Sequence, residues 1–375
     1  MNPTPLILID TGIIGGPGRG IIQLAKYFGS NNIRYLICNF RYRAPKSREF
    51  EDELRRQGLH AATVLQRSSI DPTPIVQFFR LAKSGHYNIV QSHGYKSHLV
   101  ALIVSRVAGL PWVAFAHGWT HEDRKVTLYH SLDRWMLRFA DTVVAVSPPL
   151  CALFRGLRGK NRETKLIFNA VDPLGLLGEV GGETLRKRLL KGEGGLLVGC
   201  FGRLSHEKGQ DILLRAIPSV IETFPTASFL LLGDGPAKKA LEELATELGI
   251  RERVLFQPHA SAMRDYYEAI DLLVLPSRSE GLPNVILEAL SFGVEVVATD
   301  VGAVGEVIRG RKTSRLVPSG DVEALAAGIM EGLSARARQD TETAARGGGL
   351  DEKFTPEYRG QQIVALYKDV LRQQR

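Results

Sequence analysis

The feature that most constrains the fold is a regular alternation of short apolar runs with longer amphipathic segments. Such alternation is typical of a parallel β-sheet whose two faces are covered by helices. It predicts strands at Leu6–Asp10, Tyr35–Asn39, Asn88–Gln91, Trp112–Ala116, Thr142–Val146 and Lys165–Phe168, and again at Leu196–Cys200, Ser228–Leu232, Val254–Gln257, Leu272–Leu275 and Glu295–Thr299. Helices are predicted at Ile21–Phe28, Glu49–Gln57, Pro74–Lys83, Ser97–Ala108, His130–Ala140, Pro149–Phe154, Gln210–Thr223, Ala237–Leu248, Met263–Ala269, 321–334 and Thr355–Arg372.

The alternation is interrupted once, by a glycine-rich stretch, and then restarts. A chain of 375 residues is also long for a single core, so two domains of ordinary size are expected. We predict two Rossmann-like α/β domains at residues 1–172 and 195–354, a linker at 173–194, and a separate closing helix at 355–375.

Charge is divided unevenly along the chain. Residues 1–170 carry 23 Lys and Arg against 11 Asp and Glu, whereas residues 171–375 carry 25 against 29. A basic half indicates an anionic partner. A membrane surface and a phosphorylated acceptor fit this charge equally well. No nucleic-acid module is recognisable, so nucleic acid is not expected as a partner.

The expected location follows from what the sequence lacks. No apolar run reaches the roughly 18 residues that a membrane helix needs, and the first residues do not resemble a signal peptide. The three cysteines, Cys38, Cys151 and Cys200, are odd in number and far apart, which favours reduced thiols. We therefore expect a cytoplasmic protein that docks peripherally on the cytoplasmic membrane face.

Residues 276–293 place two glutamates between two predicted strands. Glu280 lies in a loop rich in Ser, Gly and Pro, and Glu288 lies within the helix that follows. In open α/β sheets, ligands bind at the carboxyl ends of the strands. Glu280 is therefore expected to accept hydrogen bonds from sugar hydroxyls, and Glu288 to bind two vicinal hydroxyls such as those of a ribose. The alternative is that each merely complements the helix dipole.

The start of the same helix is a predicted phosphate site. Pro283 suits the first helical position, where its missing N–H is no loss. The amides of Asn284 and Val285 then have no partner within the helix and can bind phosphate.

Two glycine-containing turns are also predicted to bind phosphate. Arg203 and Lys208 lie in Gly202–Gly209, before a helix, and two cations there suit a diphosphate; the alternative is a solvated basic turn. The glycine cluster between Gly12 and Gly20 can cradle phosphate on backbone N–H groups. Its alternative is a flexible turn that needs positive φ.

Two histidines end predicted strands of the first half. His93 and His117 are each followed by glycine. An imidazole at the carboxyl end of a strand can hydrogen-bond a substrate hydroxyl or a phosphate. The alternative for each is a structural histidine whose hydrogen bonds are satisfied within the protein.

Taken in order, these motifs resemble the retaining glycosyltransferases of family 4, which have the GT-B fold. The resemblance rests on the Gly12–Gly20 loop, His117-Gly, Asn169-Ala-Val-Asp172, Gly202-Arg-Leu-x3-Lys-Gly209 and Glu280-x7-Glu288. Residues 117–120 through Leu132-Asp-Arg134 are similar to members that act in bacterial surface-polysaccharide synthesis.

The resemblance implies a role for each matched position. It implies two Rossmann-like domains facing a central cleft, with the closing helix crossing back to the first domain. The donor is a nucleotide diphosphate sugar, and no metal or other cofactor is expected. The resemblance implies that Arg203, Lys208 and the Gly16 amide contact the diphosphate, that Glu280 and His117 contact the transferred sugar, and that Glu288 binds the ribose. Beside these, we predict that Asn284 and Val285 join the diphosphate site, that Gly281 and Leu282 join the sugar site, and that His93 contacts the acceptor or the donor.

Two positions depart from the family pattern, and two rival functions stay open. Glu295 stands where Pro is usual, and Ala303 where Gly is usual, so local backbone geometry is expected to differ. The expected activity is transfer of a hexosyl or related sugar to a glycan or lipid-linked hydroxyl, with retention. The alternatives are a GT-B nucleotide-sugar epimerase or hydrolase, and a non-catalytic nucleotide-sugar-binding module.

Overall fold

The structure is a computed structural model that describes residues 2–42, 47–67, 71–118, 124–158, 163–176, 178–192, 194–311, 314–339 and 350–374. The chain divides into two compact units. Unit 1 comprises Met1–Ala170 and Glu352–Arg375, and unit 2 comprises Val171–Asp351. Each unit contains one parallel sheet with interleaved helices, as the alternation predicts.

The sheet of unit 1 reverses its strand order once. Its strands run in the order β3-β2-β1-β4-β5-β6-β7, and all neighbours pair in parallel. The chain therefore steps outward from β1 in one direction and then returns to its other side at β4. The strands are β1 (Pro5–Ile9), β2 (Leu36–Tyr42), β3 (Ala61–Gln66), β4 (Ile89–His93), β5 (Trp112–Ala116), β6 (Thr142–Ala145) and β7 (Glu163–Leu166).

Helices cover both faces of this sheet because successive residues of a strand point to opposite faces. On β1, Ile7 and Ile9 belong to the core formed with α1 (Gly16–Ser30), α2 (Glu49–Arg56) and α14 (Pro356–Gln373). Leu6 and Leu8 belong to the other core. That second core is formed with α3 (Thr73–Lys83), α4 (Tyr95–Ala108), α5 (Arg124–Leu137) and α6 (Pro148–Arg158).

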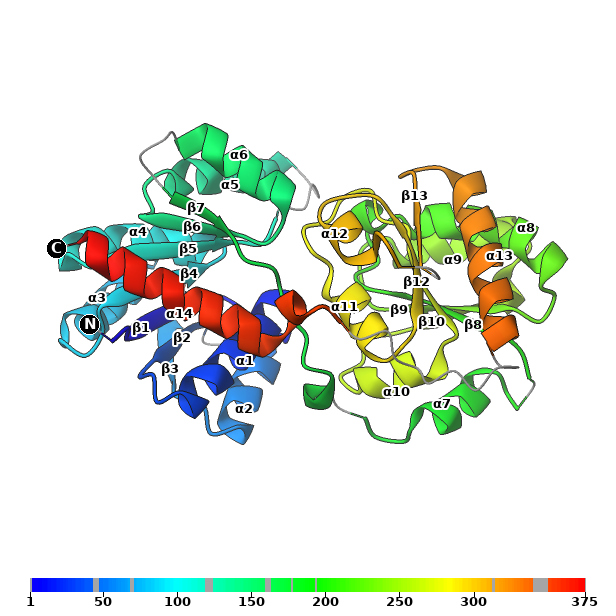
Figure 1. The fold of residues 1–375 in the computed structure, drawn as a ribbon, viewed down its shortest axis with the longest axis horizontal. Coiled ribbons are helices and arrows are strands. Elements are labelled where there is room, and N and C mark those ends of the chain that lie inside the picture. Colours follow the sequence, from blue (N-terminus) through cyan, green and yellow to red (C-terminus); the bar gives the residue numbers. More distant parts are fainter. Residues whose placement is uncertain are drawn as a thin grey trace. The chain divides into compact units, whose positions relative to one another are not determined.

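The last helix of the chain packs on unit 1, which confirms the predicted return of the closing helix. Figure 1 shows α14 (red) lying over the sheet beside α1. The side chain of Arg359 is 4% exposed and donates from Nη1 to the carbonyl of Gly20 at 2.9 Å. Burial lowers the pKa of this guanidinium to about 10. Gly360 faces the ring of Tyr27, so both helices use glycine at their closest approach.

The glycine cluster differs from its prediction. Helix α1 begins at Gly16, not at Ile21, so Gly16, Gly18 and Gly20 are helical, and none of the cluster has positive φ. The flexible-turn alternative is therefore wrong. Packing explains two of these glycines, because a Cβ on Gly18 would lie 3.3 Å from the Phe50 ring and one on Gly20 3.2 Å from Arg359.

Unit 2 repeats the same reversal. Its strands run in the order β10-β9-β8-β11-β12-β13, again all in parallel. The strands are β8 (Leu197–Phe201), β9 (Ser228–Leu232), β10 (Val254–Gln257), β11 (Leu272–Leu275), β12 (Glu295–Thr299) and β13 (Arg315–Val317). The helices are α7 (Gly182–Leu189), α8 (Gln210–Thr223), α9 (Lys238–Glu247), α10 (Met263–Ala269), α11 (Asn284–Ser291), α12 (Val304–Ile308) and α13 (Val322–Gln339).

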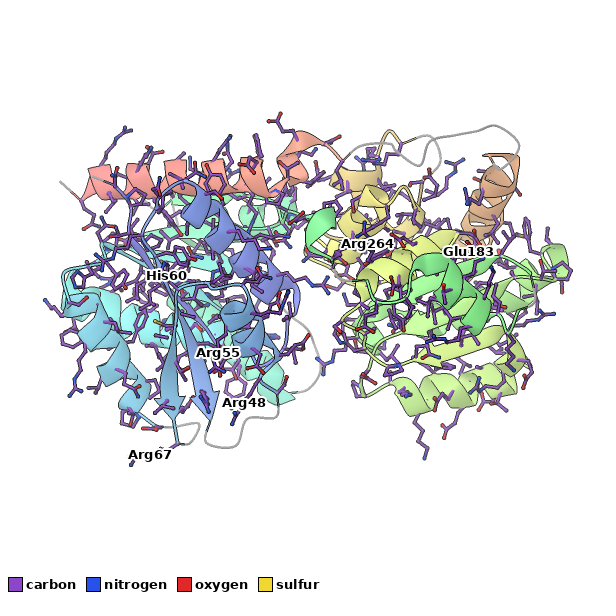
Figure 2. All side chains as sticks on the ribbon, turned by 90° about the horizontal axis from the view of Figure 1, so that it is seen from below. Arg48, Arg55, His60, Arg67, Glu183 and Arg264 are labelled. Atoms are coloured by element: carbon purple, nitrogen blue, oxygen red, sulfur yellow. The ribbon has the colours of Figure 1, made fainter. Side chains whose placement is uncertain are left out.

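The segment predicted as a linker, 173–194, is bonded to unit 2. Helix α7 contacts α10, and Figure 2 labels Glu183 and Arg264 on these two helices. The Asp265 carboxylate accepts hydrogen bonds from the amides of residues 179–181 at 2.8–3.2 Å. Arg186, from the predicted basic patch, forms an ion pair with Asp271 at 2.6 Å.

Three short elements escaped prediction. Strand β3 has only two buried residues among six, so no continuous apolar run marks it. Strand β13 has three residues and α12 has five, too few to show a period. Among the described helices, none combines the length and the apolar character that crossing a membrane requires.

The contact between α1 and α14 makes a testable prediction. In Gly360→Ala the new Cβ would lie 2.4 Å from Cγ of the Tyr27 ring. The helices must then separate, and we expect the free energy of unfolding to fall by about 1–3 kcal/mol. The matched control is Gly29→Ala on α1, where no heavy atom lies within 4 Å. That change should be neutral or slightly stabilising in urea unfolding; equal effects of the two variants would contradict this account.

Candidate active site

A pocket of about 270 Å³ opens in unit 1 at the carboxyl edge of the sheet. The pocket lies where the strand order reverses. Most of its lining residues come from the ends of β1, β4 and β5 and from the segments that follow these strands. At this point the loops after β1 and β4 run to opposite faces of the sheet and leave room for a ligand. The lining residues are Ile9, Asp10, Thr11, Gly15, Pro17, Gly18, His93, Gly94, His98, Phe115, Ala116, His117, Gly118 and Asp133.

The two predicted histidines are hydrogen-bonded to each other in this pocket. His93 Nδ1 lies 2.9 Å from His117 Nε2, and the rings stack with centroids 5.2 Å apart. The amide nitrogen of Gln91 lies 2.6 Å from His93 Nε2, and the hydroxyl of Tyr367 on α14 donates to the Gln91 carbonyl oxygen. The order along this chain is Tyr367, Gln91, His93, His117.

This chain of hydrogen bonds has a fixed direction. Because an amide nitrogen can only donate, His93 Nε2 must accept, so its proton resides on Nδ1. His93 Nδ1–H then donates to His117 Nε2. The proton of neutral His117 is therefore on Nδ1, and this N–H is a donor that His93 does not occupy. His93 thus has both ring nitrogens hydrogen-bonded within the protein, which agrees with the alternative of a structural histidine. It also lines the pocket.

Both imidazoles are held in the neutral form. Burial lowers the pKa of His117 to about 3, with further contributions from Arg359 and His98. Burial, and then His117 itself, lowers the pKa of His93 well below its ordinary range. At neutral pH, His117 is therefore a neutral hydrogen-bond donor and not a cation. A neutral N–H donor is suited to bind the oxygen of a sugar hydroxyl.

A histidine–aspartate pair in the same pocket was not predicted from the sequence. His98 lies in the first turn of α4 and is 1% exposed, and its Nδ1–H donates to Asp133 Oδ1 at 2.6 Å. Among the described residues, its Nε2 is buried without a hydrogen-bond partner. A buried polar atom of this kind costs free energy unless a ligand or water satisfies it. The two residues are 35 positions apart, so spacing alone gave no signal.

The predicted residue Gly16 lies next to residues that line the pocket. Gly16 is the first residue of α1, and its neighbours Gly15 and Pro17 line the pocket. Lys96 forms an ion pair with Asp10 at 2.8 Å beside it. Residues 119–123 of the stretch that resembles surface-polysaccharide enzymes lie outside the described residues.

In unit 2, the loops after β8 and β11 bring predicted residues together at the corresponding reversal. Lys208 Nζ lies 2.6 Å from Glu280 Oε1, and Ser277 Oγ donates to the same oxygen at 2.7 Å. The Glu280 side chain is 7% exposed, and that of Lys208 is 24% exposed. Arg203 is two residues beyond β8, and its carbonyl accepts from Gln210 at 2.9 Å. The sequence predicted that Lys208 binds the diphosphate and Glu280 the sugar hydroxyls, but it did not predict an ion pair between them.

Glu288 is more deeply placed than Glu280. It is 1% exposed, and the hydroxyl of buried Tyr267 donates to its Oε2 at 2.6 Å. It therefore does more than complement a helix dipole. Helix α11 begins at Asn284 with Pro283 as its N-cap, one residue later than predicted. Asn284 Oδ1 is buried without a partner among the described residues.

The two departures from the family pattern, Ala303 and Glu295, lie in different surroundings. Ala303 has φ −107°, and the positive φ of the turn (61°) falls on Gly302. A Cβ on Gly302 would lie 2.2 Å from the carbonyl oxygen of Glu280, so glycine is required there. Glu295 begins β12, at the opposite edge of the sheet, and accepts from Ser314 at 3.0 Å. Ala303 therefore does not need positive φ in this turn.

The His117 chain predicts an unusual tautomer and a pH dependence. In ¹⁵N NMR, His117 should be neutral with its proton on Nδ1 from pH 8 down to about pH 4. The unfolded state binds a proton near the ordinary value of 6.5, so stability should fall as pH decreases through 6.5 toward 3. Because the ring is partly accessible, we expect a loss of only about 1 kcal/mol between pH 7 and pH 5.

Tyr367→Phe should mix the two tautomers, because Gln91 is then free to rotate its amide. The control is Tyr358→Phe on the same helix, which should leave the His117 spectrum unchanged. A protonated His117 at pH 6, or an Nε2–H tautomer in the wild-type protein, would contradict the assigned direction.

Two family models match this chain, one in each half. Residues 14–173 match the model described as Glycosyltransferase Family 4, and residues 195–335 match the model described as Glycosyl transferases group 1. Together they cover β2–β7 of the first sheet, all six strands of the second, and Gly16, His93, His117, Lys208, Glu280 and Glu288.

Individual relatives support the same family. The lipopolysaccharide core biosynthesis mannosyltransferase LpsB of Rhizobium meliloti is 31% identical over 182 residues, 47% of this chain and 52% of that protein. The putative teichuronic acid biosynthesis glycosyltransferase TuaC of Bacillus subtilis is 33% identical over 235 residues, 61% of this chain and 57% of that protein. The chain thus spans about half the length of these curated relatives.

A solved structure shows the fold. Anabaena Alr3699/HepE, crystallised with UDP and glucose, is 24% identical and matches with a TM-score of 0.81 over 98% of this chain and 100% of that one. The two parallel-sheet units and the returning α14 are those of the GT-B fold. With both family models matched, the chain belongs to the family 4 glycosyltransferases of GT-B fold.

Proposed function

We propose that this protein is a retaining glycosyltransferase that moves a sugar from a nucleotide diphosphate sugar to a hydroxyl of a glycan or lipid-linked acceptor. The observation that carries the proposal is the Lys208–Glu280 pair at the strand reversal of unit 2. It places a cation for phosphate and a carboxylate for hydroxyl groups within 2.6 Å of each other, as the two ends of a sugar–phosphate bond require.

The donor is bound by groups of different character. Arg203, Lys208 and the first amides of α11, from Asn284 and Val285, hold the diphosphate and stabilise its charge as it departs. When a diphosphate binds the Lys208 ammonium group, the ion pair with Glu280 Oε1 breaks. That oxygen can then accept a hydrogen bond from a sugar hydroxyl. Gly281 and Leu282 complete this wall, and Glu288 binds the ribose.

In unit 1, His117 is a neutral hydrogen-bond donor. We propose that its Nδ1–H bonds to a sugar oxygen, that His93 orients it, and that the Gly16 amide binds phosphate. The acceptor oxygen forms a bond to the anomeric carbon as the bond from that carbon to the phosphate oxygen breaks. The acceptor proton passes to the leaving phosphate on the same face, which retains the configuration. The residues named here need no metal for this step.

The relatives support a role in surface-polysaccharide or glycolipid synthesis. LpsB is named for the lipopolysaccharide core and TuaC for teichuronic acid. The relatives differ in donor, because LpsB is a mannosyltransferase whereas HepE was solved with UDP-glucose. The sugar and the base therefore have to be measured.

Substitutions at the ion pair should separate binding from transfer. Lys208→Met should weaken binding of a nucleoside diphosphate, because it removes a cation from the phosphate site. Glu280→Gln should leave that binding within about threefold and lower kcat by about 100-fold or more, as removal of a group that acts on the transition state does. Isothermal titration and a radiolabelled-sugar transfer assay measure the two effects.

A matched ion pair provides the control. Lys239 and Glu243 form an exposed pair at 3.8 Å on α9, and Lys239→Met and Glu243→Gln should change neither quantity. If Glu280→Gln transferred sugar with the kcat of the wild-type protein, the role assigned to Glu280 in transfer would be excluded. Turnover of donor without acceptor would favour a hydrolase or epimerase, and binding without turnover would favour a binding module.

A thermal-shift panel should identify the base and the sugar. A ligand present at 100 times its Kd stabilises the folded state by roughly 2.7 kcal/mol. We expect this shift from one of UDP, GDP or ADP and its sugar, and no change when EDTA is added, because the proposed site holds phosphate with protein cations. Loss of the shift in EDTA would contradict metal independence.

A further inference from the structure

Helix α4 is apolar on its outer side as well as its inner side. Its inner residues, including Val100, Ala101 and Val104, are buried in the core of unit 1. Its outer side exposes Tyr95, Leu99, Ile103 and Val107, which recur every fourth residue and are 37–62% exposed. Residues four apart share one face of a helix. Helices of soluble proteins usually place polar residues on that face.

The neighbouring helices extend this surface. On α5, which contacts α4, the exposed large side chains are Tyr129, Leu132 and Trp135, at 44–50% exposure. Tyr95 and Tyr129 stack across the two helices with centroids 5.2 Å apart and planes 9° apart. On α3, which contacts α4 on its other side, Val76 is 49% exposed. We call this set, Val76, Tyr95, Leu99, Ile103, Val107, Tyr129, Leu132 and Trp135, the outer face.

The exposed charges described on these three helices have one sign. Helices α3 and α4 contain no Asp or Glu, and the one acidic residue of α5, Asp133, is 5% exposed and bonded to His98. The exposed cations among the described side chains are Arg80 and Lys83 on α3, Arg106 on α4, and Arg138 directly after α5. Part of the basic excess of residues 1–170 is therefore gathered around an exposed apolar surface.

We propose that the outer face docks unit 1 on an anionic lipid bilayer. Tyr and Trp suit the boundary between headgroups and acyl chains, and the flanking cations suit anionic headgroups. A second protein copy is a poorer fit, because α3 and α4 show exposed cations and α3, α4 and α5 have, among their described side chains, no exposed carboxylate to pair with them. Helix α4 has 14 residues, too few to span a bilayer, so it would lie in the interface.

The outer face adjoins the pocket, which gives the docking a use. The first turn of α4 carries both kinds of residue: Tyr95 and Leu99 belong to the outer face, and His98 lines the pocket. An acceptor anchored in the bilayer could therefore place its hydroxyl in the pocket while its lipid stays in the membrane. This second step rests on the proposed glycosyltransferase function, whereas the docking itself does not.

Vesicle binding tests the docking directly. Full-length protein is mixed with vesicles of phosphatidylcholine containing 30% phosphatidylglycerol, and bound protein is measured by flotation. We expect binding that falls at least tenfold in Leu99→Asp/Ile103→Asp and about fivefold in Arg106→Gln, since one interfacial cation contributes roughly that factor. Emission from Trp135 should shift to shorter wavelength on binding, and Trp135→Phe should remove that shift.

Matched variants on unit 2 provide the controls. Val180→Asp changes an apolar residue that is 42% exposed, and Lys239→Glu reverses an exposed cation, and neither should alter vesicle binding. All variants should keep the wild-type unfolding temperature and nucleotide-dependent thermal shift, which separates this test from that of the transferase activity. Absent binding, equal binding by the α4 variants, or a dimer in sedimentation that Leu99→Asp/Ile103→Asp dissociates would each overturn the proposal.

Discussion

The reversal of strand order in each sheet is the constraint on which the rest of the structure depends. In unit 1 the order reverses between β1 and β4, and in unit 2 between β8 and β11. Loops that leave these neighbouring strands diverge to opposite faces, so an opening forms at the carboxyl edge without any loss of core packing. His93 ends β4 and His117 follows β5 in the first sheet, and Lys208 and Glu280 belong to loops that follow strands of the second. Residues distant in sequence thus lie close together because the strand order brings the ends of their strands to the same edge of the sheet.

The pocket of unit 1 derives its electrostatic character from burial. Desolvation keeps His93 and His117 neutral, and a directed chain of hydrogen bonds from Tyr367 decides which nitrogen of His117 carries the proton. That chain starts on the last helix, which packs on α1 at the glycines described above. The closing helix therefore does more than complete the core: it fixes the chemical state of a residue 250 positions earlier in the sequence. His98 and Asp133 add a second oriented imidazole to the same pocket.

Sequence patterns predicted the architecture well where elements are long or deeply buried, and poorly where they are short or half exposed. The eleven predicted strands correspond to strands of the structure, whereas β3 was missed because it lies at the sheet edge with few buried residues. The glycines of α1 were attributed to backbone conformation, but Gly18 and Gly20 are packed against Phe50 and Arg359. A single sequence does not show which distant side chain a glycine faces, so the two explanations could not be separated.

The sequence by itself determined two α/β domains, the loops that carry the site, and the residue types at those loops. Local periodicity and spacing encode these features, because they depend on neighbours along the chain. Only the tertiary structure decided which groups pair: Lys208 with Glu280, Glu288 with Tyr267, His98 with Asp133, and His93 with His117. It also decided that the outer side of α4 is exposed, since an apolar helix gives no sign in sequence of which face the core will leave uncovered. Partner choice across tens of residues is set by strand order and helix packing, and these are properties of the whole fold.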